Sequence, residues 1–178
     1  MRHLRKTLAA VGAVVVVATT AVVVQGGVGA AEPEVQADQA VAHLHAQVDL
    51  PAGVWTSTPL VVTLPWAGTY EIDADVRGRL SGVPSFNSYI TARLWNDTTN
   101  SAVPESERLV NQIIDRNAGA AGTGSNHTAP ISEVVRVDGP TTIRLQAIRV
   151  DAEGAATIAQ IYSDAAGYTS LRFDRVGP

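Results

Sequence analysis

Three carboxylates at alternate positions are the densest group of potentially reactive side chains: Glu71, Asp73 and Asp75. On an extended strand they would share one face at intervals of about 6.8 Å. This spacing is compatible with a calcium site, or with paired acid–base carboxylates, which stand about 5–9.5 Å apart in glycosidases. We favour a solvated strand face balanced by arginines of neighbouring strands, because calcium ligands usually converge from loops. The arginines considered for this balance are Arg77, Arg79, Arg144 and Arg172.

Other motifs for chemistry are weak. His43 and His45 form the one close histidine pair, and on a helix positions two apart face different sides, so they could not chelate a metal together. His127 stands alone, and no Gly-x-Ser-x-Gly elbow anchors a nucleophile. The glycines of segment 119–124 do not follow a buried strand and open a helix, so they predict no phosphate cradle. We therefore expect no catalytic residues, no metal and no cofactor, with a hydrolase of unrecognised site as a third alternative.

Three tryptophans stand out in a chain with only 5% aromatic residues. Trp66 and Trp95 lie near the ends of predicted strands, and Tyr89 shares a strand with Trp95. These rings could form a sugar-stacking platform, which would make the protein a carbohydrate-binding module. Alternatively, they close the end of the core or seal a subunit interface, which is the interpretation we favour. The candidate interface or ligand-binding residues are Trp55, Trp66, Tyr89 and Trp95.

Composition excludes several classes of protein. The 178 residues contain no Cys, which excludes a disulfide scaffold, a thiolate zinc site and a thiol nucleophile. The 17 acidic residues outnumber the 13 basic ones, which argues against a nucleic-acid partner. Arg2, Arg5 and Lys6 open the chain, so ten basic residues, all arginine, remain beyond them.

The N-terminal pattern is typical of a secretory signal. The three basic residues precede an uncharged run over 8–24 and a stretch rich in Gly and Ala. We predict that residues 1–31 are a signal peptide cleaved near Ala30 or Ala31, giving a secreted protein with no membrane segment after cleavage. The alternative is an uncleaved anchor, although a run of this length reaches only about 26 Å as a helix.

Residues 32–53 form a lead-in with one weak periodicity. Ala37, Val41, Leu44 and Val48 are spaced four, three and four residues apart, as on one stripe of a helix. We expect a solvated tether or a short helix. The alternative is a segment that brings several chains together before their domains begin.

From residue 50 onward the pattern changes to that of β-strands. Short runs of alternating or β-branched residues recur every ten to fifteen positions, separated by Gly, Pro, Asn and Asp. Period two with one polar face is typical of antiparallel sheets. We predict an all-β, antiparallel two-sheet sandwich over residues 54–178. The predicted strands are 59–65, 69–80, 88–96, 108–115, 131–138, 141–151, 156–163 and 168–176.

The order of landmarks resembles a known superfamily. Gly68-x-Tyr70 at a strand entry, the segment Arg93-Leu94-Trp95-Asn96 and the final stretch from Gly167 to Leu171 are similar to landmarks of bacterial and phage relatives of the jelly-roll domain. This superfamily includes tumour necrosis factor and the globular heads of complement. The resemblance covers about residues 54–177, and its motifs are structural.

This resemblance implies a jelly roll of eight or ten strands that forms a trimer and works by binding, without shared catalytic residues. Some members hold calcium at the trimer apex through loop carboxylates, but no matching loop cluster occurs here. We therefore expect a secreted, non-enzymatic homotrimer that recognises a surface or an extracellular ligand, including carbohydrate. The alternative is a monomeric carbohydrate-binding module that uses exposed tryptophans.

Overall fold

The computed structural model describes residues 38–178, so the predicted signal peptide lies outside the described residues. Contacts divide the chain into residues 1–34 and residues 35–178, and the fold below is that of the second unit. All regular elements of the described part are strands, and none of its segments is an apolar helix of membrane-spanning length.

Eleven strands follow one another along the chain. Six belong to one sheet and five to the other. The six are β1 (Gln39–His43), β2 (Val48–Asp49), β4 (Gly68–Gly82), β8 (Thr123–Val137), β10 (Ala156–Ile161) and β11 (Ser170–Gly177). The five are β3 (Thr56–Leu64), β5 (Phe86–Asn96), β6 (Ser101–Ala102), β7 (Arg108–Asp115) and β9 (Thr141–Glu153).

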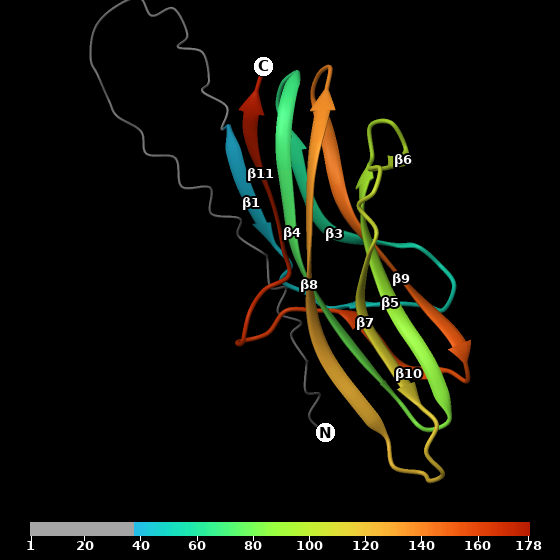
Figure 1. The fold of residues 1–178 in the computed structure, drawn as a ribbon. Helices are drawn as coiled ribbons and strands as arrows, with labels where there is room; N and C mark the ends of the chain where they lie inside the picture. The colour runs from blue at the N-terminus through green and yellow to red at the C-terminus, as the bar shows by residue number, and fades with distance from the viewer. Residues whose placement is uncertain (1–37) are drawn as a thin grey trace, which may run out of the picture. The chain divides into compact units, whose positions relative to one another are not determined.

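The strand order is that of a jelly roll. In one sheet β1 pairs with β11, β11 with β4, and β4 with β8, whereas in the other β3 pairs with β9, β9 with β5, and β5 with β7. All of these pairs are antiparallel, and the chain passes repeatedly between the two layers (Figure 1). β2 and β10 extend the first sheet, and β6 extends the second. The predicted antiparallel two-sheet jelly-roll sandwich is therefore confirmed.

Alternating side chains fill one core between the sheets. Along β4, Tyr70, Ile72 and Val76 are fully buried, and Ile90 and Leu94 of β5 face them from the other layer. Each buried large apolar side chain contributes about 1.5–3 kcal/mol relative to exposure. Because the side-chain period of a strand is two, this burial also fixes which residues face outward on each sheet.

The lead-in was predicted as a tether or a short helix, and this is wrong for its described part. β1 pairs with β11 over five residues, and β2 pairs with β10. Leu44 and Leu50 are buried in the core. The helical spacing is not decisive, because Ala40, Ala42 and Leu44 also fit the alternation of a strand. Pairing with distant strands supplies the backbone hydrogen bonds that favour a strand over a helix.

Polar side chains close the gap between the sheets beside β7 and β8. The buried Asn111 side chain donates to the carbonyl oxygens of Gly78 and Ser125 at 3.1 Å each, and accepts from the Ser125 hydroxyl at 2.9 Å. Arg108 and Glu133 form an ion pair of 2.8 Å across the same edge. These contacts hold the two layers together where apolar packing ends.

Candidate binding face on the five-stranded sheet

The outer face of the five-stranded sheet carries a stack of three side chains. The Arg93 guanidinium carbon lies 3.8 Å from the ring centroid of Trp55 and 4.7 Å from that of Trp95. Arg93 and Trp95 point outward because Ala92 and Leu94, which alternate with them along β5, point into the core. Trp55 immediately precedes β3 and is brought over β5 by the pairing of β3 with β9 and of β9 with β5.

Hydrogen bonds fix the position of the guanidinium. Nε and Nη2 of Arg93 donate to Oε1 of Gln146 at 3.1 and 3.0 Å, and Gln146 in turn donates to the Ser57 hydroxyl at 3.1 Å. Gln146 is only 8% exposed, although it belongs to the outer face. Glu107 approaches Nη1 at 3.6 Å. The charge at the centre of this face is therefore held in place and partly neutralised.

Apolar side chains extend the face toward β7. Tyr89 lies opposite Val150, and Thr91 lies between Ile148 and Leu109 in the strand register. Leu109 and Ile114, both on β7, are 55% and 58% exposed. An aromatic and aliphatic surface therefore crosses β9, β5 and β7, next to the Trp55–Arg93–Trp95 stack.

The charges at the edge of this face are paired. Arg144 contacts Asp97 with an ion pair of 2.8 Å and donates to the Thr58 carbonyl oxygen at 2.9 Å. Arg116 and Glu153 approach within 3.5 Å at the other end. The outer face of the five-stranded sheet therefore presents neutral pairs around an apolar centre.

The structure brings three of the four predicted residues, Trp55, Tyr89 and Trp95, to this one face. Trp66 lies elsewhere, between β3 and β4, where its backbone nitrogen donates to the Tyr70 hydroxyl at 3.3 Å. The guanidinium carbon of Arg175 lies 5.5 Å from the Trp66 ring. Trp66 therefore caps one end of the sandwich and takes no part in the candidate binding face.

Sequence reasoning missed Arg93 and Gln146, which organise the aromatic residues. Both occupy positions of the outward face, and the alternation along β5 and β9 assigns them to it. Their contact depends on the register between these strands, in which Arg93 lies opposite Gln146. Only the strand pairing reveals this neighbour relation, because the two residues are far apart in the chain.

The other sheet carries a polar outer face. Asp73, 22% exposed at its side chain, forms an ion pair of 2.9 Å with Arg172 of β11, and Glu71 and Asp75 are exposed. Hydrogen bonding to Asp73 raises the pKa of Arg172 further above its usual range. The described residues contain no cluster of three or more His, Cys, Asp and Glu side chains suited to a metal. The three carboxylates therefore form a solvated strand face with an arginine partner.

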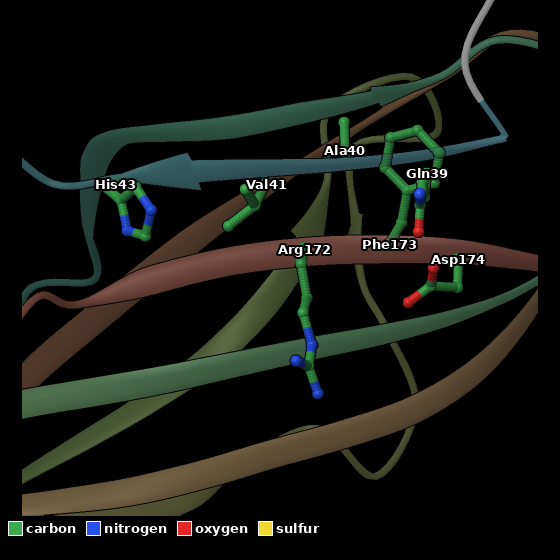
Figure 2. A pocket seen from close by; sticks show the side chains of 7 residues that line it. All are labelled: Gln39, Ala40, Val41, His43, Arg172, Phe173 and Asp174. Atoms are coloured by element: carbon green, nitrogen blue, oxygen red, sulfur yellow. The ribbon is translucent and has the colours of Figure 1, made fainter.

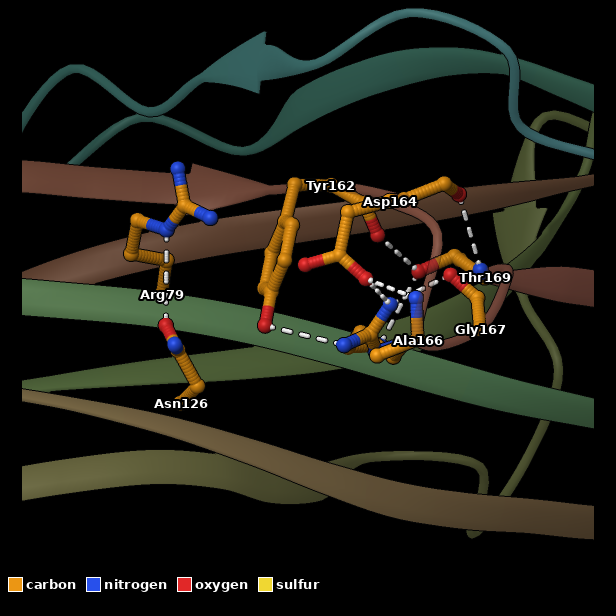
Figure 3. Close-up of polar contacts among 9 residues, drawn as sticks. Arg79, Asn126, Tyr162, Asp164, Ala166, Gly167 and Thr169 are labelled. Carbon is orange, nitrogen blue, oxygen red and sulfur yellow. Dashed lines mark hydrogen bonds and ion pairs between the residues drawn. The ribbon is translucent and has the colours of Figure 1, made fainter.

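A buried tyrosine anchors the loop between β10 and β11. The guanidinium carbons of Arg77 and Arg79 lie 4.6 and 4.2 Å from the Tyr162 ring centroid. Arg77 also donates to Asp164 at 2.7 Å and to the Gly167 carbonyl oxygen, and Figure 3 shows the Tyr162 ring between Arg79 and Asp164. The hydrogen bond from Arg77 lowers the pKa of Asp164 and raises that of Arg77. These contacts hold the loop between β10 and β11 in place, and the charges of Arg77 and Asp164 are paired with each other.

A shallow groove of about 590 Å³ follows β1 and β11 on the six-stranded sheet (Figure 2). Arg172, one of its lining residues, is bound to Asp73. Val41, another lining residue, is 57% exposed. The groove is open and mixed in character, so it defines no binding chemistry by itself.

Comparison with known proteins gives no family. No family model matches the chain, and no curated protein matches it. Among solved structures it is similar to a chain of infectious bursal disease virus, Gx strain, with 16% identity, 76% of this chain and 32% of that chain covered, and a TM-score of 0.42. It is also similar to the VP2 subviral particle of infectious bursal disease virus, with 14% identity, 76% of this chain and 31% of that chain covered, and a TM-score of 0.43. The chain thus spans about a third of the length of these proteins, and the strand order above remains the basis of the fold assignment.

Proposed function

We propose that this protein is a secreted, non-catalytic binding domain that forms a homotrimer through the outer face of its five-stranded sheet. The observation that carries the proposal is the partly buried Trp55–Arg93–Trp95 stack, continued by the exposed Leu109 and Ile114. Exposed apolar patches of this kind mark interaction surfaces in soluble proteins. The N-terminal signal pattern supports secretion, and the resemblance to tumour necrosis factor and complement heads supports a trimer.

A second copy of the chain is the occupant that fits the charge of this face. The described residues contain ten arginines and 15 acidic residues, a net charge of −5, so two copies repel one another over most of their surface. On the five-stranded sheet the charges are paired, because Arg93 is held by Gln146 and Glu107 and Arg144 is held by Asp97. Electrostatic repulsion between two copies of the chain is therefore weakest at this face. A strongly charged partner would meet few unpaired charges there.

The dimensions of the sheet are sufficient for a stable contact. Four strands spaced about 4.8 Å apart, each of about nine residues at 3.4 Å, give a flat footprint of roughly 600 Å². The accessible area of a face covered by side chains exceeds its footprint. About 800 Å² per partner, the usual scale of a stable interface, is within reach.

The alternative of a monomeric carbohydrate-binding module rests on the partly exposed indoles. Sugars stack on the flat face of an aromatic ring. The Arg93 guanidinium, 14% exposed, lies between the Trp55 and Trp95 rings and takes one face of each. This packing favours the subunit interface over the sugar platform.

The mass of matched variants in solution tests the proposal. Leu109→Asp and Ile114→Asp each place a charge on an exposed residue of β7, so a monomer tolerates them within about 0.5 kcal/mol. In a buried interface the same charge is costly. The control is Val134→Asp, which alters a residue 68% exposed on the outer face of the other sheet.

We expect light scattering to give a trimer for the wild type and for Val134→Asp, and a monomer for Leu109→Asp and for Ile114→Asp, with unchanged circular dichroism in all four. A change of Trp95 to Asp would be less informative, because Trp95 also packs on Arg93 within one chain. If all the variants remain trimeric, the interface lies elsewhere. A monomeric wild type whose tryptophan fluorescence changes on addition of oligosaccharide would favour the carbohydrate-binding alternative.

A further inference from the structure

His43 and His45 project from the same side of the chain, which the helical expectation had excluded. β1 ends at His43, but its pairing with β11 continues, because the Leu44 nitrogen donates to the Thr169 carbonyl oxygen at 2.9 Å. The Leu44 side chain is buried in the core. Since side chains alternate along an extended segment, the histidines on either side of Leu44 both face solvent. Their exclusion as a chelating pair assumed a helix and does not hold for this geometry.

One tyrosine ring packs against both imidazoles. The Tyr168 ring centroid lies 5.3 Å from that of His43 and 5.9 Å from that of His45. Both histidines are exposed, and Tyr168 is 54% exposed. Figure 2 shows the His43 ring at the end of β1, apart from the other side chains that line the groove. Both imidazoles thus belong to exposed residues and pack against the same ring.

We propose that His43 and His45 bind a divalent transition-metal ion, such as Zn²⁺, Ni²⁺ or Cu²⁺. Residues two apart on an extended chain are about 6.8 Å from each other, and rotation of the exposed rings brings one nitrogen of each toward a shared ion at 2.0–2.1 Å. Imidazole suits these metals, whereas Ca²⁺ and Mg²⁺ prefer oxygen ligands.

The surroundings define the character of this site. No third His, Cys, Asp or Glu joins the pair to complete a cluster within residues 38–178, so water fills the remaining coordination positions. Arg172, the nearest arginine on the same face of β11, is bound to Asp73. Tyr168 acts as a positioning residue through its ring. The site therefore takes an exchangeable metal ion, in contrast to a closed structural zinc site with four protein ligands.

Calorimetric titration of the purified chain with Zn²⁺ tests this inference. Loss of a group that only supports a metal ligand lowers metal affinity by roughly tenfold or more. We therefore expect His43→Ala and His45→Ala, which each remove a ligand itself, to weaken Zn²⁺ binding by at least about tenfold. The matched control is His127→Ala, because His127 is the one other histidine beyond the predicted signal peptide, and this variant should bind Zn²⁺ as the wild type does. Tyr168→Phe keeps the ring and should retain binding, and Ca²⁺ should give no heat of binding.

Three results would overturn the inference. Wild-type protein that shows no binding of Zn²⁺ at millimolar concentration has no such site. Loss of binding in His43→Ala alone, with His45→Ala unchanged, would mean that one histidine binds the ion without the other. Loss of binding in His127→Ala would place the ion elsewhere. Thermal unfolding of every variant at the wild-type temperature would show that the change is one of ligation and not of folding.

Discussion

Replacing Arg93 with methionine tests whether the tryptophan stack is organised as the structure indicates. Methionine keeps an unbranched apolar stem between the Trp55 and Trp95 rings but removes the guanidinium. Two donors to Gln146 at 3.1 and 3.0 Å are lost, and the buried Gln146 oxygen keeps no charged partner. Both cation–π contacts, at 3.8 and 4.7 Å, are lost as well.

The expected cost follows from these contacts. Hydrogen bonding to a charged group contributes about 1.5–3 kcal/mol, and we count the shared Gln146 oxygen once. Each cation–π contact at a partly exposed site adds about 0.5–1 kcal/mol. The Glu107 contact, at 3.6 Å with that side chain 57% exposed, adds little. Arg93→Met should therefore lower the free energy of unfolding by about 2.5–5 kcal/mol.

Urea unfolding followed by tryptophan fluorescence measures this change, because two of the three tryptophans lie in the stack. A suitable control is Arg116→Met, since Arg116 is 70% exposed and approaches Glu153 only at 3.5 Å. That variant should change stability by less than about 0.5 kcal/mol. If Arg93→Met costs no more than Arg116→Met, the stack does not hold the face together and the reasoning fails.

Other measurements address the loop, the carboxylates and the N-terminus. Thr169→Val, at a fully buried residue, removes a hydroxyl that donates to the Tyr162 carbonyl oxygen at 2.8 Å and accepts from the Arg77 nitrogen at 3.0 Å, so urea unfolding should show a loss of about 2–5 kcal/mol. Hydrogen bonds lower the pKa of Asp115, mainly through the Thr123 hydroxyl, and that of Asp164, mainly through Arg77. The stabilisation that these two ionised carboxylates provide is fully present above the ordinary pKa of 3.8 and is lost as pH falls through their lowered pKa values. Asp164→Asn should therefore make the free energy of unfolding depend less steeply on pH below 3.8. An unchanged slope would contradict this. N-terminal sequencing of secreted protein should begin near Ala31 or Glu32, whereas Met1 retained in a membrane fraction would favour the uncleaved anchor.

Alternation within strands made most of the sheet predictable. The predicted strand 108–115 coincides with β7, and 141–151 lies within β9. β8 begins at Thr123, well before the predicted start at residue 131. The prediction missed its first half because that half is rich in Gly, Ser, Asn and Thr, a composition typical of loops. Pairing with β4 over its whole length supplies the hydrogen bonds that its side chains do not signal.

Long-range pairing set the limit for the candidate site. Tyr89 and Trp95 share a face by the alternation of β5, which the sequence shows directly. Trp55 joins them only because β9 lies between β3 and β5, and this order is a property of the jelly roll. His43 and His45 were misjudged for a related reason, since their local pattern fits a helix but their pairing with the last strand makes them extended.

The molar mass of the wild-type protein in solution tests the central claim most directly. Light scattering at micromolar concentration should give three times the mass of one chain, the state that the resemblance to trimeric jelly-roll domains implies, with the aromatic outer face of the five-stranded sheet buried between copies. A mass equal to that of a single chain over this concentration range would contradict the proposed self-association through Trp55, Tyr89, Trp95 and their neighbours.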